Sequence, residues 1–212
     1  MTRPFLLALL VGLGLGAPLP ALAQASAPAA TAAAPSAADE AAARALVNNL
    51  IAELQAAASG PGDMAVREAR LRAIVAQRLD SSRIARFMLG ANRAKATPAE
   101  LARYEELAPR FIAIEFSRRI DELVAQQLTI ESVQARGPNE ILVRSVFPRK
   151  RDGARVRIDW RLTRAGPQAE WRLLDVFLNG VSRLVIRRDE FNAIVARQGM
   201  AGLITHLENF QG

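Results

Sequence analysis

Few residues of this chain carry the side chains that covalent or acid–base catalysis requires. Its 212 residues include no cysteine and one histidine, His206. Thiolate nucleophiles, cysteine-based zinc sites and iron–sulfur clusters are therefore excluded. A two-histidine metal site would lack its second histidine, and no second catalytic group accompanies His206 to form a histidine-based triad. We expect no metal site and no cofactor, and we predict that the protein is not an enzyme.

Two aspartates remain as candidates for acid–base chemistry. Asp159 and Asp175 each lie in a segment where apolar residues alternate with charged ones, a pattern typical of a β-strand. A buried carboxylate needs a partner, and the chain is rich in arginine, so structural ion pairs are the expected role. The alternative is an enzyme site in which one of the two acts as a general base.

The formal net charge of +7 comes almost wholly from arginine, since lysine occurs only at positions 95 and 150. Such an excess favours an anionic partner, either nucleic acid or lipid headgroups. Arginines cluster at 118–119, 149–151 and 187–188 with little aromatic interleaving, which argues against a stacking platform for nucleic acid. A lipid surface, an acidic partner and ordinary solvated turns all stay open for these clusters.

The first residues match a secretory signal. Arg3 precedes an apolar run from Phe5 to Ala17, and Ala21 and Ala23 provide a cleavage site, so we expect residues 1–23 to be removed on export. The run is too short to span a membrane. An Ala/Pro/Ser-rich flexible leader is expected over 24–38, followed by a single domain over 39–212. We therefore expect an exported protein whose anionic partner is a membrane surface and not nucleic acid.

The elements that must position these residues follow from hydrophobic periodicity. Helices are predicted over 39–58, 63–79, 80–90 (capped by Asp80) and 97–127, the last with a Thr97–Glu100 capping box and a kink or break at Pro109. Strands are predicted over 129–137, 140–150, 154–165 and 170–182. Closing helices follow, the first with Asp189 as its N-cap. This order predicts an α+β fold, mostly helical over 39–95, with a helix, an antiparallel sheet and C-terminal helices over 96–212.

The stretch VRIDWRLTRAGPQAEWRLLDVFL, residues 156–178, predicts a hairpin with one apolar face. A packed core and the lining of a ligand pocket produce the same alternation of apolar and charged residues. Periodicity alone therefore leaves both interpretations open for this face.

Several strings in the chain resemble the MlaC/Ttg2D family of exported phospholipid-binding proteins. They are RIARFMLG (83–90), ATPAELARYEEL (96–107), VRIDWRL (156–162) and EWRLLDVFLNGVSRLVIRRDEF (170–191). The resemblance runs in collinear order over residues 40 to 210. Two features depart from the family pattern: Ala91-Asn92 stands where an aromatic residue usually follows Gly90, and Pro109 interrupts a long helix.

The resemblance implies a fold, a ligand and partners. The fold would be a helical subdomain joined to a curved antiparallel sheet, similar to an NTF2-like roll, with acyl chains held between sheet and helices. The cargo would be a phospholipid, or a hopanoid as in a branch of the family encoded with hopanoid biosynthesis. The partners would be an inner-membrane ABC transporter complex, which supplies the energy, and an outer-membrane lipoprotein complex. We expect a monomer.

The apolar residues of the predicted sheet and of the long helix are the expected lipid contacts. These are Phe111, Phe116, Ile120, Val143, Phe147, Val156, Ile158, Trp160, Val176, Leu178 and Val181. A non-enzymatic lipid carrier is the favoured function. Apart from a hopanoid cargo, the alternatives are an NTF2-like enzyme and an interaction module without a ligand.

Overall fold

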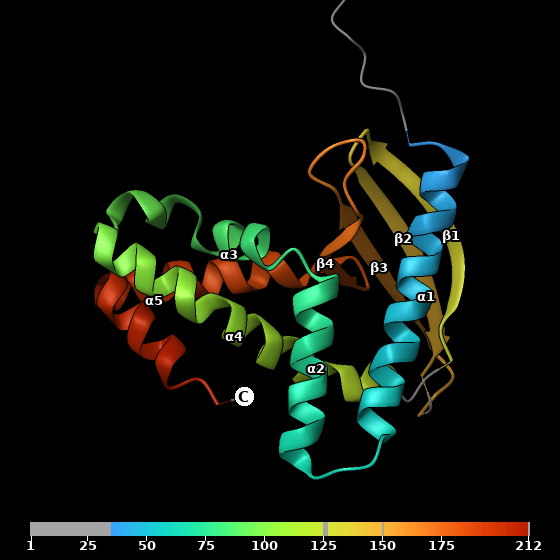
Figure 1. The fold of residues 1–212 in the computed structure, drawn as a ribbon, viewed down its shortest axis with the longest axis horizontal. Coiled ribbons are helices and arrows are strands. Elements are labelled where there is room, and N and C mark those ends of the chain that lie inside the picture. The colour runs from blue at the N-terminus through green and yellow to red at the C-terminus, as the bar shows by residue number, and fades with distance from the viewer. Residues whose placement is uncertain (1–34, 125–126, 150, 212) are drawn as a thin grey trace, which may run out of the picture. The chain divides into compact units, whose positions relative to one another are not determined.

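Helices packed against one antiparallel sheet make up the described part of the chain (Figure 1). The structure is a computed structural model that describes residues 35–124, 127–149 and 151–211, without the side chains of residues 58, 64 and 117–124. Its elements are, in order, α1 (Ala37–Ser59), α2 (Met64–Arg78), α3 (Ser81–Leu89), the short 3₁₀-helix η1 (Gly90–Lys95), α4 (Pro98–Val124), β1 (Thr129–Gly137), β2 (Glu140–Pro148), β3 (Arg155–Thr163), β4 (Arg172–Leu178), β5 (Val181–Ser182) and α5 (Arg183–Glu208).

Local capping explains where the helices begin. The Ser36 hydroxyl and the Asp39 carboxylate form a capping box, so α1 starts at Ala37, two residues before the expected Asp39. Asp80 accepts a hydrogen bond from the Arg83 amide at the start of α3. At the start of α4 the Thr97 hydroxyl accepts from the Glu100 amide at 3.2 Å, and the Glu100 carboxylate accepts from the Thr97 amide at 2.8 Å. The starts of α3 and α4 were predicted from the sequence, whereas the Ser36 cap of α1 was not.

The strands form one sheet in the order β1-β2-β3-β4-β5, and every neighbouring pair is antiparallel. The register places Val143 opposite Trp160, so both point to the inner face, while Arg144 and Asp159 point to the outer face. A bulge where β3 pairs with β4 lies between Arg161 and Leu162. The α+β class and the curved antiparallel sheet agree with the sequence prediction.

The inner face of the sheet is covered by two groups of helices. Helix α1 contacts β1 and β2, with α2 beside it, whereas α3 and α5 contact β4 (Figure 1). Helix α4 contacts α1, α2, α3 and α5 and so joins the two groups. The sheet is therefore covered by α1 at one end and by the α3–α4–α5 group at the other.

Two details differ from the sequence prediction, and one agrees with it. The predicted strand over 170–182 is two strands, β4 and β5, separated by Asn179 and Gly180, both with positive φ. Asp189 is not an N-cap, because α5 begins six residues earlier, where the Ser182 hydroxyl accepts from the Val185 amide at 2.9 Å. The two predicted closing helices agree with the structure: they are the parts of α5 before and after Gly199, and the backbone of Gly199 itself is non-helical.

Helix α4 is not broken at Pro109; its bounds run on through this residue to Val124. Proline removes one hydrogen bond and crowds the preceding turn. Its neighbours Ala108 and Phe111 are fully or almost fully buried, so packing on both sides of the proline offsets that cost.

None of the helices in the described ranges combines the length and the apolar composition that crossing a membrane requires.

Candidate functional site

A cavity of about 160 Å³ lies between the β4 end of the sheet and helices α3, α4 and α5. Each of these elements contributes apolar side chains to its wall. The lining residues are Leu79, Ile84, Met88, Phe111, Ile112, Glu115, Phe116, Ile158, Leu173, Leu174, Asp175, Val176, Leu178, Arg183, Leu184 and Arg187.

The cavity has an apolar bottom and a mixed mouth. Met88, Phe111, Ile158 and Leu173 are 2% exposed or less, so they mark its depth. Phe116 and Val176 are half-buried, and Leu178 is 37% exposed, so they mark where the cavity opens. Glu115, Arg183 and Arg187 are half-buried in the same wall. A molecule with an apolar body and a polar end therefore matches this arrangement better than a wholly apolar one.

The mouth carries a charged pair between two helices. The Arg187 guanidinium of α5 donates to the Glu115 carboxylate of α4, and these side chains are only 20% and 13% exposed. The same guanidinium donates through its other terminal nitrogen to Glu190, which is 48% exposed. Arg187 thus has one buried and one exposed carboxylate partner.

Asp175 lines the cavity, but its carboxylate is engaged with α5. One oxygen accepts from the Val176 amide at 2.8 Å and from the Leu184 amide at 3.0 Å, and the other accepts from the Ser182 hydroxyl at 2.6 Å. Burial raises the pKa of Asp175, and the three hydrogen bonds oppose that rise. This carboxylate fixes the start of α5 against β4.

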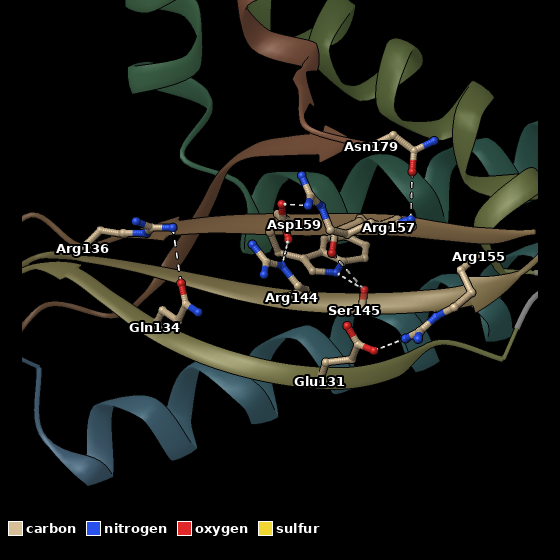
Figure 2. Close-up of polar contacts among 11 residues, drawn as sticks. Glu131, Gln134, Arg136, Arg144, Ser145, Arg155, Arg157, Asp159 and Asn179 are labelled. Carbon is tan, nitrogen blue, oxygen red and sulfur yellow. Dashed lines mark hydrogen bonds and ion pairs between the residues drawn. The ribbon is translucent and has the colours of Figure 1, made fainter.

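Asp159 points away from the cavity, on the outer face of the sheet (Figure 2). Its carboxylate accepts from Arg144 Nε at 2.8 Å and lies 3.2 Å from Arg157 Nε. The side chain is 6% exposed and covered by its two arginine partners. This arrangement matches the ion-pair role expected from the sequence. Asp159 lies on the outer face of β3, whereas Asp175 lies on β4 and lines the cavity. The two carboxylates therefore form no joint acid–base pair.

Five of the eleven residues predicted as lipid contacts line the cavity. They are Phe111, Phe116, Ile158, Val176 and Leu178. Four others, Val143, Phe147, Val156 and Trp160, lie in the buried core and do not line this cavity. Val181 is 53% exposed beside the β4–β5 turn. The side chain of Ile120 lies outside the described residues.

The core placement of Val143 and Trp160 has a physical reason. These two residues pair in register, and α1, whose Ala43, Val47 and Leu50 are fully buried, contacts the strand that carries Val143. The Trp160 indole donates to the Ser145 hydroxyl at 2.9 Å, and this hydroxyl donates to the Ile158 carbonyl at 3.2 Å. The polar atoms of this region are satisfied internally, and α1 fills the space above it.

Sequence reasoning missed most of the cavity wall formed by helices. Ile84 and Met88 are spaced i, i+4 on α3, a signal that marks one buried face but not what that face contacts. Leu173 and Leu174 are neighbours in the sequence, and both line the cavity because β4 bulges opposite Arg161 and Leu162. Simple alternation, which points neighbouring side chains to opposite faces, did not predict this. Glu115 was not singled out in the sequence, and the Arg187–Arg188 cluster left a lipid surface, an acidic partner and a solvated turn equally open.

No metal centre is present in the described ranges, where no group of three histidine or acidic side chains gathers. His206 is exposed, with its ring 6.3 Å from that of Phe111 and 5.9 Å from that of Phe210.

Comparison with known proteins places this architecture in a family. One solved structure, of the phospholipid-binding protein from Ralstonia solanacearum in complex with a phospholipid, aligns with a TM-score of 0.61. The alignment covers 80% of this chain and 94% of that one at 17% identity, so it shows a shared fold. None of the curated proteins compared with the chain matches it. The profile of the family described as MlaC protein matches residues 44–209, and the chain therefore belongs to the MlaC family.

Proposed function

We propose that this protein is a periplasmic lipid carrier that takes the acyl chains of a phospholipid into the cavity between β4 and α3–α5. The observation that carries the proposal is the cavity itself, which is apolar at its depth and charged at its mouth. Membership of the MlaC family and the fold shared with a phospholipid-binding protein support it.

The free energies of lipid transfer explain why such a carrier is needed. Each buried methylene contributes about 0.8 kcal/mol, so a two-chain lipid leaves a membrane very slowly through water. A cavity that shelters the chains replaces that aqueous step. Because the same burial opposes release, the carrier must receive and deliver lipid at partner proteins. We propose an inner-membrane ABC transporter complex and an outer-membrane lipoprotein complex as these partners, and a monomer as the carrier.

The size of the cavity adds a requirement. Pockets that enclose a drug-sized ligand have about 300–1,000 Å³, so a cavity of about 160 Å³ accommodates only part of an acyl chain. Loading a two-chain lipid therefore requires the α3–α5 group and β4 to move apart. The half-buried Phe116 and Val176 and the exposed Leu178 lie on the side where separation disturbs the least packing.

Lipid analysis of the purified protein tests the function. The protein is expressed with its natural N-terminus, purified from the periplasm without harsh detergent, and extracted under denaturing conditions for mass spectrometry. We expect about one phospholipid per protein. A stoichiometric triterpenoid would instead assign a hopanoid cargo, and no lipid after gentle purification would contradict the carrier function.

Export is tested in the same preparation. The expected signal peptide over 1–23 lies outside the described residues. If this peptide is cleaved, the intact mass of the purified protein should equal that of a chain beginning at Gln24. A soluble cytoplasmic pool that retains Arg3 would contradict export.

A further inference from the structure

Charged side chains from α4 and α5 lie together at the mouth of the cavity. Arg187 lies one helical turn after Arg183 on α5, and both side chains line the same wall. Glu115 faces Arg187 from α4, directly before the half-buried Phe116 of the cavity mouth. The charges therefore lie where the polar end of a bound lipid would emerge.

A purely structural pair between α4 and α5 is a costly way to join two helices at this place. Removing an ion from water costs several kcal/mol, and two apolar side chains of similar volume often hold helices together equally well. The Glu115–Arg187 pair is nevertheless largely buried beside an apolar wall. A charged group that must meet a charged ligand explains this choice of residues.

The two partners of Arg187 differ in how easily an incoming anion can replace them. Glu115 is only 13% exposed and holds the guanidinium in place from the α4 side. Glu190 is 48% exposed and only three residues away on the same helix. An ion pair with a solvent-exposed carboxylate contributes little to stability, so an anion arriving from the mouth can displace Glu190 while Glu115 stays bound.

Guanidinium geometry fits one chemical class of anion. Arginine presents planar, paired N–H donors that match the oxygens of a phosphate, and its charge persists at all physiological pH values. The nearby start of α5 does not compete for this role, because Asp175 and Ser182 already accept its Leu184 and Val185 amides.

We propose that Arg187, held by Glu115, binds the phosphodiester of the lipid whose chains fill the cavity, and that Glu190 occupies this position until lipid binds. Arg183 adds a second positive charge to the same wall. The inference rests on the proposed lipid-carrier function and deepens it, because it makes the headgroup phosphate part of what the protein selects. A polycyclic lipid without phosphate would gain nothing from Arg187.

A competition between two lipids tests the proposal. Delipidated protein is mixed with equal amounts of phosphatidylglycerol and a diacylglycerol with the same acyl chains, and the bound lipids are extracted and counted by mass spectrometry. We expect wild type to prefer phosphatidylglycerol. A hydrogen bond to a charged group is lost in Arg187→Gln, so this preference should fall about 10- to 100-fold, while diacylglycerol still binds.

Three further variants keep the test decisive. The double variant Glu115→Gln, Arg187→Gln removes the buried pair as a unit, so it should lose the preference even if Arg187→Gln alone is poorly folded. Glu190→Gln removes the exposed competitor and should strengthen the preference. Arg188→Gln is the matched control, since Arg188 pairs with Asp189 and lies over the Phe87 ring, 5.5 Å from its centroid.

The outcomes separate this proposal from the function on which it rests. An unchanged preference in both Arg187 variants, or an equal loss in Arg188→Gln, would overturn the phosphate site and leave the lipid carrier intact. Displacement of bound phosphatidylglycerol by inorganic phosphate would show a general anion site and overturn its assignment to lipid. Wild-type protein that binds neither lipid would overturn the carrier function itself.

Discussion

The inner face of the sheet has two regions that look alike in sequence and differ in structure. The packed region comprises β1, β2 and the facing part of β3 beneath α1; Val143 and Trp160 lie at its centre, 0% and 1% exposed. The cavity region comprises β4 and the Ile158 end of β3 beneath α3–α5. Both regions show alternating apolar side chains. The difference comes from the helices above them.

The covering helices explain the difference. Over the packed region, α1 presents a row of small and medium aliphatic residues that fits closely onto the sheet, of which Ala43, Val47 and Leu50 are fully buried. Over the cavity region, α4 and α5 place Glu115, Arg183 and Arg187 among their apolar residues. Charged side chains cannot close over an apolar sheet as aliphatic ones do, because they keep their polar ends hydrated or paired. A helix face that mixes charged and apolar side chains therefore leaves a cavity between the helix and the sheet.

The largest expected effect is in the packed region, where Val143→Trp forces an indole into a space that α1 and Trp160 already fill. Overpacking of this kind costs about 1–3 kcal/mol, and more where the backbone cannot shift. Chemical denaturation of delipidated protein measures the loss. A variant as stable as wild type, but without bound lipid, would show that Val143 borders the lipid after all, as the sequence prediction had it.

A second effect concerns the polar cluster that fixes α1 onto the packed region. Arg164 donates to Asp39 at 2.5 Å and to the Pro138 carbonyl at 2.9 Å, and it lies over the Trp171 ring, 4.5 Å from its centroid. Its side chain is 9% exposed. Arg164→Ala should cost about 2 kcal/mol, because it removes a cation–π contact and leaves acceptors without their donor.

The control for this variant is Arg136→Ala. Arg136 donates to Gln134 at 3.3 Å on the exposed outer face of the sheet (Figure 2). An exposed contact of this kind changes stability by about 0.5 kcal/mol or less. Lipid content per folded molecule should stay the same in both variants. Loss of lipid in Arg164→Ala at full stability would show that the two regions are coupled.

The same comparison shows how far sequence reasoning reaches. The limits of β1, β2 and β3 were predictable because each of these strands is followed by a turn rich in Gly, Pro or Asp, and the starts of α3 and α4 were predictable from local capping residues. Asp189 was a wrong cap because Ser182, seven residues before it, is held by Asp175 from another element. Local sequence cannot rank two capping residues whose choice depends on a tertiary contact.

The cavity was predictable only in part. Alternation along β2, β3 and β4 shows which side chains point inward, and it correctly placed Ile158, Val176 and Leu178 on the inner face. Alternation does not show which helix packs over each strand. That depends on contacts between segments far apart in the chain, such as α3 with β4. Val143 and Ile158 are thus equivalent in pattern, yet only Ile158 lines the cavity.

A smaller effect is expected at the border of the cavity, from Asp175→Asn. The amide keeps one oxygen for the Val176 and Leu184 amides but places an NH₂ group where the Ser182 hydroxyl donates, so the loss of this hydrogen bond should cost about 1 kcal/mol at pH 7. Burial raises the pKa of Asp175 in the folded state above its ordinary value of 3.8.

The direction of this pKa shift fixes the pH dependence. Between the unfolded and the folded pKa, the folded protein binds more protons than the unfolded chain, so this group adds stability as pH falls through that window. The stability difference between wild type and Asp175→Asn should therefore grow on acidification from neutral pH. Denaturation curves at several pH values measure it, and a difference that shrinks would contradict a raised pKa.

The smallest effect on stability is predicted for Val176→Trp, which repeats the Val143→Trp change in the cavity region. Val176 pairs with Trp160 across β3 and β4, but its half-buried side chain borders the cavity mouth. The indole can enter a space of about 160 Å³ without displacing packed neighbours, so delipidated protein should unfold within about 0.5 kcal/mol of wild type. The same indole occupies volume that an acyl chain needs, so bound phospholipid should fall sharply.

The two tryptophan variants form a matched pair. Val143 and Val176 both pair with Trp160, from the strands on its two sides, so the variants add identical atoms to the same face of the sheet. If both cost the same free energy, the space above the sheet is uniform, and the division into a packed and a cavity region is wrong.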